Sequence, residues 1–147
     1  MARPLADLAR PEPELVIIGR RDVRTNNSWM HNLPTLAKGP FRCTALVNPI
    51  DAARLGLQDG GLAQIAARTF PPETPRVVQA QVQISAQMMP GVVSLPHGWG
   101  HNLPGAKLHL AAQRPGANLN ALLDDQLRDP LSGNAVLGGV AITMIAV

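Results

Sequence analysis

Apolar residues along this chain gather in six short runs that are separated by segments rich in glycine, proline and polar residues. The run 15–19 is continuously apolar and ends at a glycine, which is typical of a buried strand. The run 76–84 alternates apolar and polar residues, which is typical of a half-buried strand. The other runs lie at 41–47, 62–67, 92–95 and 140–147. Short strands at this spacing predict a mainly β fold with short helices, closed as a compact barrel.

One segment between the second and third runs has the pattern of a short helix, 48–56. Asn48 is suited to cap its first turn, and Pro49 is suited to its first helical position. Asp51 lies in the first turn, where an acidic side chain is favourable, and Gly56 ends the helix. A second segment, 116–123, begins polar and is expected to be helical for one or two turns.

The length of the chain sets the domain organisation. With 147 residues, the chain is long enough for one domain with its own core and too short for two comfortable ones. Residues 1–14 contain three prolines and alternating charges, which predicts a linker. The domain is therefore expected to span residues 15–147.

Composition narrows the class of protein. Apolar residues make up 46% of the chain but aromatic residues only 3%, so aliphatic side chains must fill the core. The net charge of +3 suits an anionic ligand but is too small to predict nucleic-acid binding. No run is long enough to span a membrane, and no signal peptide is recognisable, which predicts a cytoplasmic protein.

Cys43 is the only cysteine, so the chain alone cannot form a disulfide or a cysteine-based zinc or iron–sulfur site. Because it lies within an apolar run, we expect a buried structural thiol. No serine–histidine–aspartate set and no distinctive carboxylate pair is present. The sequence therefore predicts no catalytic residue and no metal ligand.

The most distinctive segment is Ser94-Leu-Pro-His-Gly-Trp-Gly-His101, which mixes aromatic rings with glycine and proline. Glycine and proline exclude a regular helix here, and glycine allows a ligand to approach the backbone. His97 and His101 are four residues apart, but Gly98 and Gly100 make a helical metal site improbable. We expect a ligand-binding loop. The segment 100–107 only superficially resembles a phosphate loop, and no Rossmann glycine pattern follows a strand.

A second polar segment, 20–32, follows directly after the first apolar run. It contains Arg20, Arg21 and Arg24, and guanidinium groups there would suit a pyrophosphate, although a solvated charged turn is an equal alternative. Each of the two tryptophans, Trp29 and Trp99, lies in one of these polar segments. Tryptophans of a core usually lie in apolar runs, so this distribution favours ligand contacts.

A third group of polar residues lies near the C-terminal part of the chain. Asn118 and Asn120 are close in sequence to Asp124 and Asp125, whose carboxylates are best interpreted as a helix surface. Asp129 precedes a proline and is expected either to cap a turn or to bind a ligand.

Together these segments resemble the C-terminal molybdopterin dinucleotide-binding domain of the dimethyl sulfoxide reductase superfamily, most closely its formate dehydrogenase-like branch. The resemblance covers nearly the whole chain from about residue 15. Four segments carry it in the family's order: Gly-Arg-Arg-Asp-Val-Arg-Thr-Asn-Asn-Ser-Trp (19–29), Val-Asn-Pro-Ile-Asp-Ala-Ala-Arg-Leu-Gly-Leu-Gln-Asp-Gly (47–60), Pro-Gly-Val-Val-Ser-Leu-Pro-His-Gly-Trp-Gly-His (90–101), and Asn-Leu-Asn (118–120) with Asp-Pro-Leu-Ser-Gly (129–133).

This resemblance implies a six-stranded double-psi β-barrel that binds part of a bis(molybdopterin guanine dinucleotide) cofactor carrying molybdenum or tungsten. The implied cofactor-binding residues lie in the polar segments: Arg20, Arg24, Asn27, Ser28, Trp29, His97, Gly98, Trp99, Gly100, Asn118, Asn120 and Asp129. The metal ligand and iron–sulfur cysteines of the superfamily lie in other domains. The chain would thus position a cofactor shared with the remaining domains of an oxidoreductase and would not catalyse alone.

Two other functions stay open at this point. A free-standing double-psi barrel would act as an interaction or assembly module, and a barrel edge freed of its neighbours would allow self-association. A self-sufficient small enzyme, such as a barrel-type decarboxylase, would need a nucleophile or processing site that the chain does not show.

Overall fold

A computed structural model describes residues 14–70 and 73–147, so the expected linker at 1–14 lies almost wholly outside the described residues. The strands are β1 (Val16–Arg20), β2 (Thr44–Val47), β3 (Leu62–Ala67), β4 (Val77–Ile84), β5 (Val92–Pro96) and β6 (Val140–Ala146). The helices are α2 (Pro34–Ala37) and α3 (Pro49–Leu55), with short 3-10 turns η1 (Ala111–Gln113) and η2 (Leu119–Leu122).

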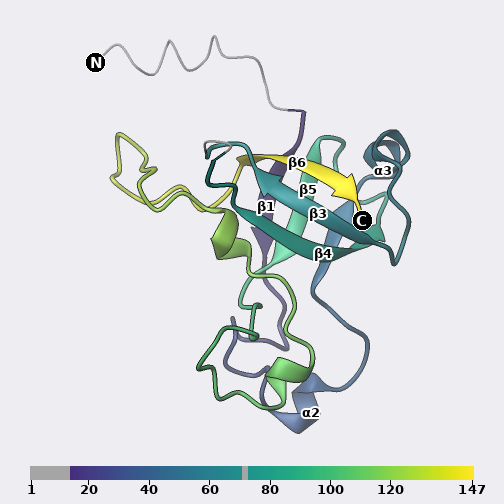
Figure 1. Cartoon of the computed structure of the whole chain (residues 1–147), viewed down its shortest axis with the longest axis vertical. Helices are drawn as coiled ribbons and strands as arrows, with labels where there is room; N and C mark the ends of the chain where they lie inside the picture. Colours follow the sequence, from purple (N-terminus) through teal and green to yellow (C-terminus); the bar gives the residue numbers. More distant parts are fainter. Residues whose placement is uncertain (1–13, 71–72) are drawn as a thin grey trace.

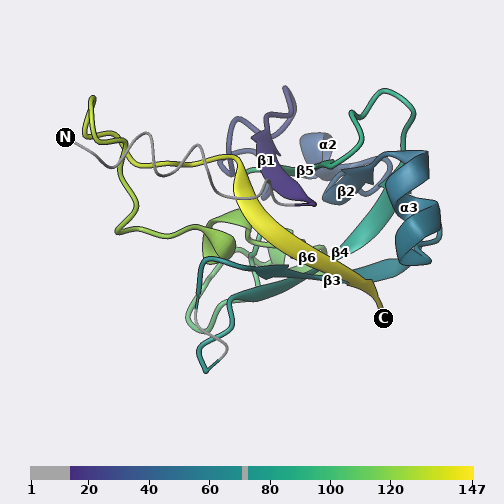
Figure 2. The same cartoon turned by 90° about the horizontal axis from the view of Figure 1, so that it is seen from above.

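The six strands form one closed barrel in the order β1-β5-β2-β4-β3-β6 (Figures 1 and 2). Two pairs are parallel, β1 with β5 and β2 with β4, and each parallel pair joins strands that are distant in the chain. These crossing connections are those expected of a double-psi barrel, and the predicted mainly β class is confirmed. Because the barrel closes, its six described strands leave no free edge, and self-association stays a prediction.

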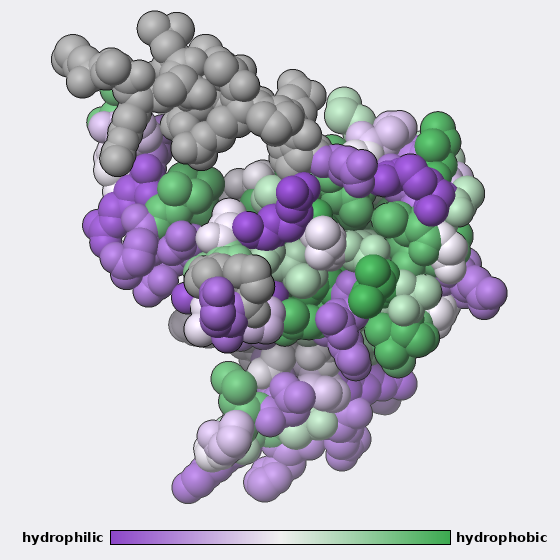
Figure 3. Space-filling model, turned by 45° about the horizontal axis from the view of Figure 1, so that its top comes forward, coloured by the Kyte–Doolittle hydropathy of each residue, from purple (hydrophilic) through white to green (hydrophobic). Residues whose placement is uncertain are grey.

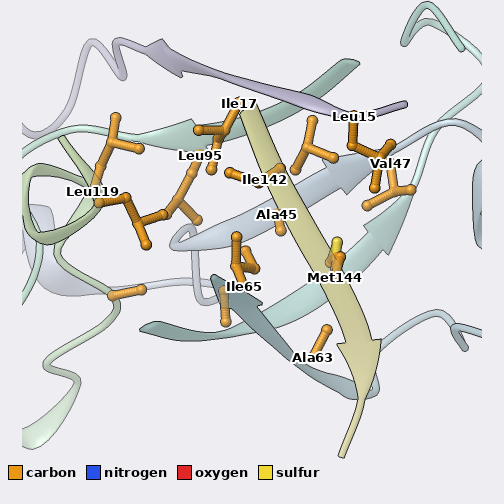
Figure 4. Close-up of a cluster of buried hydrophobic side chains, with 14 of the residues drawn as sticks. Leu15, Ile17, Ala45, Val47, Ala63, Ile65, Leu95, Leu119, Ile142 and Met144 are labelled. Carbon is orange, nitrogen blue, oxygen red and sulfur yellow. The ribbon is translucent and has the colours of Figure 1, made fainter. Parts of the chain in front are cut away.

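The barrel interior is filled by aliphatic side chains that alternate along the strands (Figure 4). In β3, for example, Ala63 and Ile65 are fully buried, while Leu62, the first residue of the strand, is half exposed. Ile17, Leu95 and Ile142 enter the same core from β1, β5 and β6. Burial of such side chains is the main source of stability that the sequence offers.

Helix α3 follows the predicted capping pattern. The Asn48 side chain accepts a hydrogen bond from the Ile50 amide at 2.8 Å, and Gly56 ends the helix with a left-handed φ of 66°. Asp51 has a role that its position did not reveal. Its buried carboxylate accepts a hydrogen bond from the Gly91 amide at 2.7 Å, which fixes the turn before β5.

One predicted strand began too early, and two short elements were missed. The predicted strand 41–47 begins only at Thr44, because Phe41 leaves the barrel to pack against Trp99 at 5.5 Å between ring centroids. Helix α2 and turn η1 were not predicted; both are too short to carry a periodic pattern.

Part of the molecular surface is apolar. Figure 3 shows apolar residues gathered on one face of the molecule. Leu62, Ile145 and Val147 are among the exposed apolar residues in or beside strands β3 and β6. Within the described parts of the chain, no helix has the length and apolar character needed to cross a membrane.

Candidate functional site: the loop lobe

Two long loops leave the same end of the barrel and fold together into a lobe (Figure 1). They follow β1 and β5, which are parallel and in register, with Arg20 opposite Pro96. The two chains therefore leave the barrel side by side. We call residues 21–43 and 97–118 together the loop lobe; it also contains α2 and η1. This placement agrees with the expectation that the first polar segment lies just beyond its strand.

The loop lobe brings three of the predicted segments into contact. Gly98 has a φ of 84° and lies so close to the Asn27 carbonyl that a Cβ atom there would overlap it. Gly100 has a φ of 105°, and a Cβ atom there would lie 2.6 Å from the Asn118 Cβ. Glycine is thus required for close approach and for backbone conformation alike. These two close approaches are separated by a single residue along the second loop, and we call Asn27, Gly98, Gly100 and Asn118 together the junction.

The junction is supported by unusual backbone at its first loop. Asn26 and Asn27 have φ values of 42° and 61°, a left-handed conformation that asparagine tolerates better than most residues. Asn27 is exposed and accepts a hydrogen bond from the Arg21 guanidinium. Ser28 is half-buried beside Gly98. An amide and a guanidinium group are therefore exposed here.

His97 and the pair Asn118 and Asn120 complete the polar surroundings. The His97 ring lies against Gly19, where a Cβ atom would overlap it. The Asn118 side-chain oxygen accepts from the Asn120 amide at 3.1 Å and so caps η2. Asn118 also lines an open groove of about 720 Å³ beside β4, whereas Asn120 is exposed and does not line it.

Arg20 has its guanidinium turned into the structure. It donates to the Ser94 carbonyl of β5 at 2.6 Å and to the Thr44 carbonyl of β2 at 2.8 Å. Strands β2 and β5 pair through one residue pair only, Leu46 with Ser94. Arg20 therefore links the two neighbouring strands that have the fewest paired residues in the barrel. We therefore interpret Arg20 as a residue that positions the loop, whereas Arg21 and Arg24 are exposed.

The two tryptophans differ. Trp29 is 81% exposed. Trp99 is partly buried and packs against the apolar core, with the His31 ring 4.0 Å away between centroids. Although both tryptophans lie in polar segments of the sequence, one is exposed to solvent and the other packs against the core.

Asp129 lies away from the junction, in an arm formed by residues 124–139 that projects from the barrel (Figure 1). Its carboxylate accepts hydrogen bonds from the Leu131 and Ser132 amides at 3.1 and 2.7 Å. These bonds, mainly those to Ser132, lower the pKa of Asp129. Of the two roles considered for Asp129, the structure shows the turn cap.

A buried histidine pair was missed by the sequence reasoning. His31 Nδ1 and His101 Nε2 are 2.5 Å apart, and both rings are more than nine-tenths buried. Burial and the neighbouring His101 lower the pKa of His31 from 6.5 to about 4, and burial also lowers the pKa of His101. Two neutral imidazoles can share one proton in a hydrogen bond. The only sequence signal was that both histidines lie beside a tryptophan-containing segment.

Asn32 was missed as well. Its side-chain oxygen accepts from the amides of Leu110 and Ala111 at 2.9 and 3.1 Å, which ties the first loop to η1. A contact across 78 residues leaves no local pattern in a single sequence.

Cys43 is buried, as expected, and accepts a hydrogen bond from the Ala117 amide at 3.2 Å. Burial raises the pKa of its thiol to about 11, so the thiolate is scarce at neutral pH. Among residues 14–70 and 73–147, no three His, Cys, Asp or Glu side chains are grouped to hold a metal ion.

Comparisons with known proteins agree with this geometry. Acetylene hydratase from Pelobacter acetylenicus has a similar structure, with a TM-score of 0.68 and 21% sequence identity. The likeness covers 97% of this chain but 19% of that one, so the chain spans about a fifth of the solved structure's length. A search of curated proteins gave no significant match. A family model described as "Molydopterin dinucleotide binding domain" matches residues 15–141. The chain therefore belongs to the molybdopterin dinucleotide-binding domain family.

Proposed function

We propose that the junction holds one guanine dinucleotide arm of a bis(molybdopterin guanine dinucleotide) cofactor with molybdenum or tungsten. The observation that carries this proposal is the convergence of Asn27, Gly98, Gly100 and Asn118 from separate parts of the chain. The family binds this class of cofactor, and these residues come from three of the four segments that carry the family resemblance.

The groups at the junction fit such a cofactor chemically. Pterin and guanine rings present amide and amino edges, which side-chain amides such as those of Asn27 and Asn118 can pair with. A pyrophosphate needs cationic and N–H donors, and Arg21 lies beside Asn27. The groove beside Asn118 is within the size range of nucleotide and small-molecule sites.

In this proposal the chain binds and orients, and it does no chemistry. The metal centre supplies the redox chemistry when the cofactor is bound. Arg20 positions the first loop against β2 and β5, and Gly98 keeps the two loops in contact. Domains beyond this chain complete the site, and the whole protein is an oxidoreductase. The cytoplasmic location and the lack of a nucleic-acid partner stay predictions.

One observation favours an interaction module as the second candidate. The arm is mostly exposed, and Leu131, in the turn capped by Asp129, is 95% exposed. An apolar side chain presented on a fixed turn suits contact with another protein or domain.

The test is a titration of the isotope-labelled chain with GDP, followed by NMR chemical-shift mapping. We expect shifts at the junction and weaker binding by the variant Asn118→Ser, which keeps an oxygen to cap η2 but loses the amide. The matched control is Asn134→Ser in the arm, which should bind like the unmodified chain. The proposal fails if GDP causes no shifts at the junction or if both variants bind GDP equally well.

A further inference from the structure

The loop lobe contains a second cavity, of about 360 Å³, between α2 and η1. Its volume is within the range of small-molecule sites. Arg24 and Trp99, which the family resemblance places among the cofactor-binding residues, line it, but neither Asn27 nor Asn118 of the junction does. The proposed dinucleotide site therefore leaves this cavity without a function.

The wall of the cavity is mainly apolar and aromatic. Leu36, Phe41 and Ala111 line it, together with the rings of His31 and Trp99. Phe41 meets Trp99 edge to face, at 71° between the ring planes, and His31 is tilted by 35° against Trp99. Such rings favour a flat apolar group in contact with them.

One nitrogen atom of this wall, Trp99 Nε1, is buried without a hydrogen-bond partner among the described residues. The indole nitrogen is a donor only, so it needs an acceptor. Leaving such a group unpaired away from water costs about 1–3 kcal/mol in mutational data. Because this nitrogen is buried even when the cavity is empty, a ligand in the cavity contacts the carbon atoms of the Trp99 ring.

The charges around the cavity have one sign. Arg24, Lys38, Arg42 and Arg114 line it, and none of the described residues in its lining is acidic. Asp22 offsets this charge partly, because its carboxylate lies 3.8 Å from Arg42. The remaining cations are exposed, so they can turn toward an anion at the opening.

We propose that this cavity binds a small organic anion, a carboxylate on a flat apolar body. The body lies against Trp99 and Phe41, and the carboxylate meets the basic side chains at the opening. This assignment goes beyond the cofactor site, and it adds a second ligand to the same lobe.

The experiment uses the two indole N–H signals of the chain as internal reporters. Benzoate is titrated into the labelled chain at neutral pH, and benzamide serves as the uncharged ligand of similar shape. We expect benzoate to bind with a dissociation constant on the order of 1 mM and to shift the Trp99 signal. The Trp29 signal should stay in place, because that ring is 81% exposed and does not line the cavity. Benzamide should bind several-fold more weakly.

The two lysines of the chain give a matched pair of variants. Lys38→Gln removes a charge from the cavity lining, and we expect about threefold weaker benzoate binding, as for an exposed ion pair. Lys107→Gln removes the same charge from an exposed position outside the lining and should leave binding unchanged. Equal binding of benzoate and benzamide, equal shifts of both indoles, or equal effects of the two variants would overturn the proposal.

A final experiment distinguishes this site from the junction. GDP is added to the chain saturated with benzoate, and we expect junction shifts while the Trp99 signal keeps its bound position. Displacement of benzoate by GDP would show that the cavity belongs to the dinucleotide site, and the separate site would be withdrawn. Absence of GDP binding, with benzoate still bound, would count against the proposed function only.

Discussion

The interior of the barrel is built from aliphatic side chains, whereas the interior of the loop lobe contains two imidazoles and an indole. Barrel strands are joined by backbone ladders, as in the five residue pairs between β3 and β4. The lobe contains the short helix α2 and the 3-10 turn η1. It is held together by side-chain hydrogen bonds and by glycines that let two loops approach closely. The barrel is therefore stabilised mainly by buried apolar area, whereas the loop lobe is stabilised by a small number of specific contacts.

The largest effect is expected in the barrel. Leu95 is fully buried, and Leu95→Ala should lower the free energy of unfolding by about 2–5 kcal/mol, because it removes apolar contacts and leaves a cavity. Leu103→Ala, at a lobe position that is 61% exposed, should change it by less than about 0.5 kcal/mol. Urea unfolding followed by circular dichroism measures both. Equal losses would remove the distinction between barrel and lobe.

The next effect concerns the fit of the lobe. Gly98 and Gly105 both have a φ of 84°, but only a Cβ at Gly98 would overlap another residue, Asn27. Gly105→Ala should cost about 1–2 kcal/mol from the left-handed backbone alone. Gly98→Ala should add roughly 1–3 kcal/mol of overpacking. Hydrogen exchange should place this added loss in the lobe, with β3 and β4 still protected. A loss spread evenly over the barrel would contradict the separation.

The smallest effect is a pH dependence confined to the lobe. The pKa of His31 is lowered to about 4, below the ordinary 6.5, mainly by burial and then by His101, while Asp22 and the backbone of Gly98 oppose the shift. The unfolded state therefore binds more protons between these values, and stability rises with pH across that window. The contribution is complete above 6.5 and is lost as the pH falls toward 4.

We expect amide exchange around His31 and Trp99 to accelerate between neutral pH and pH 4.5, after correction for intrinsic rates. The amide of Ile65 in the barrel serves as the control, and His101→Phe should flatten the dependence. The same acceleration in barrel and lobe would show that the histidine pair has no local role.

Much of the barrel could be predicted from the sequence, because its elements follow from local patterns. The alternation in 76–84 and the cap at Asn48 each depend on neighbouring residues. The lobe is different. The contact between His31 and His101 spans 70 residues, and Asn32 reaches η1 across 78. No periodic pattern records such pairs, so they emerged only from the structure.

The part of the candidate site that contains Gly98 and Gly100 could be predicted from the sequence. Gly98 and Gly100 stood out in the sequence, and both lie at close approaches of the chain. Side-chain direction was not predictable. Arg20 and Arg24 are neighbours in one polar segment, yet Arg20 bonds to strand carbonyls while Arg24 lines a cavity. Trp29 and Trp99 were separated in the same way, by burial that depends on residues distant in the chain.

The guanidinium of Arg20 has a consequence for engineering. It belongs to the last residue of β1, and the first lobe loop begins at the next residue. Its bonds to Ser94 and Thr44 thus fasten the base of that loop to both sides of the narrowest strand pairing. A graft of this loop onto another barrel should include the arginine and both receiving carbonyls as one unit. Conversely, exchanging the loop beyond this anchor should leave the host barrel intact.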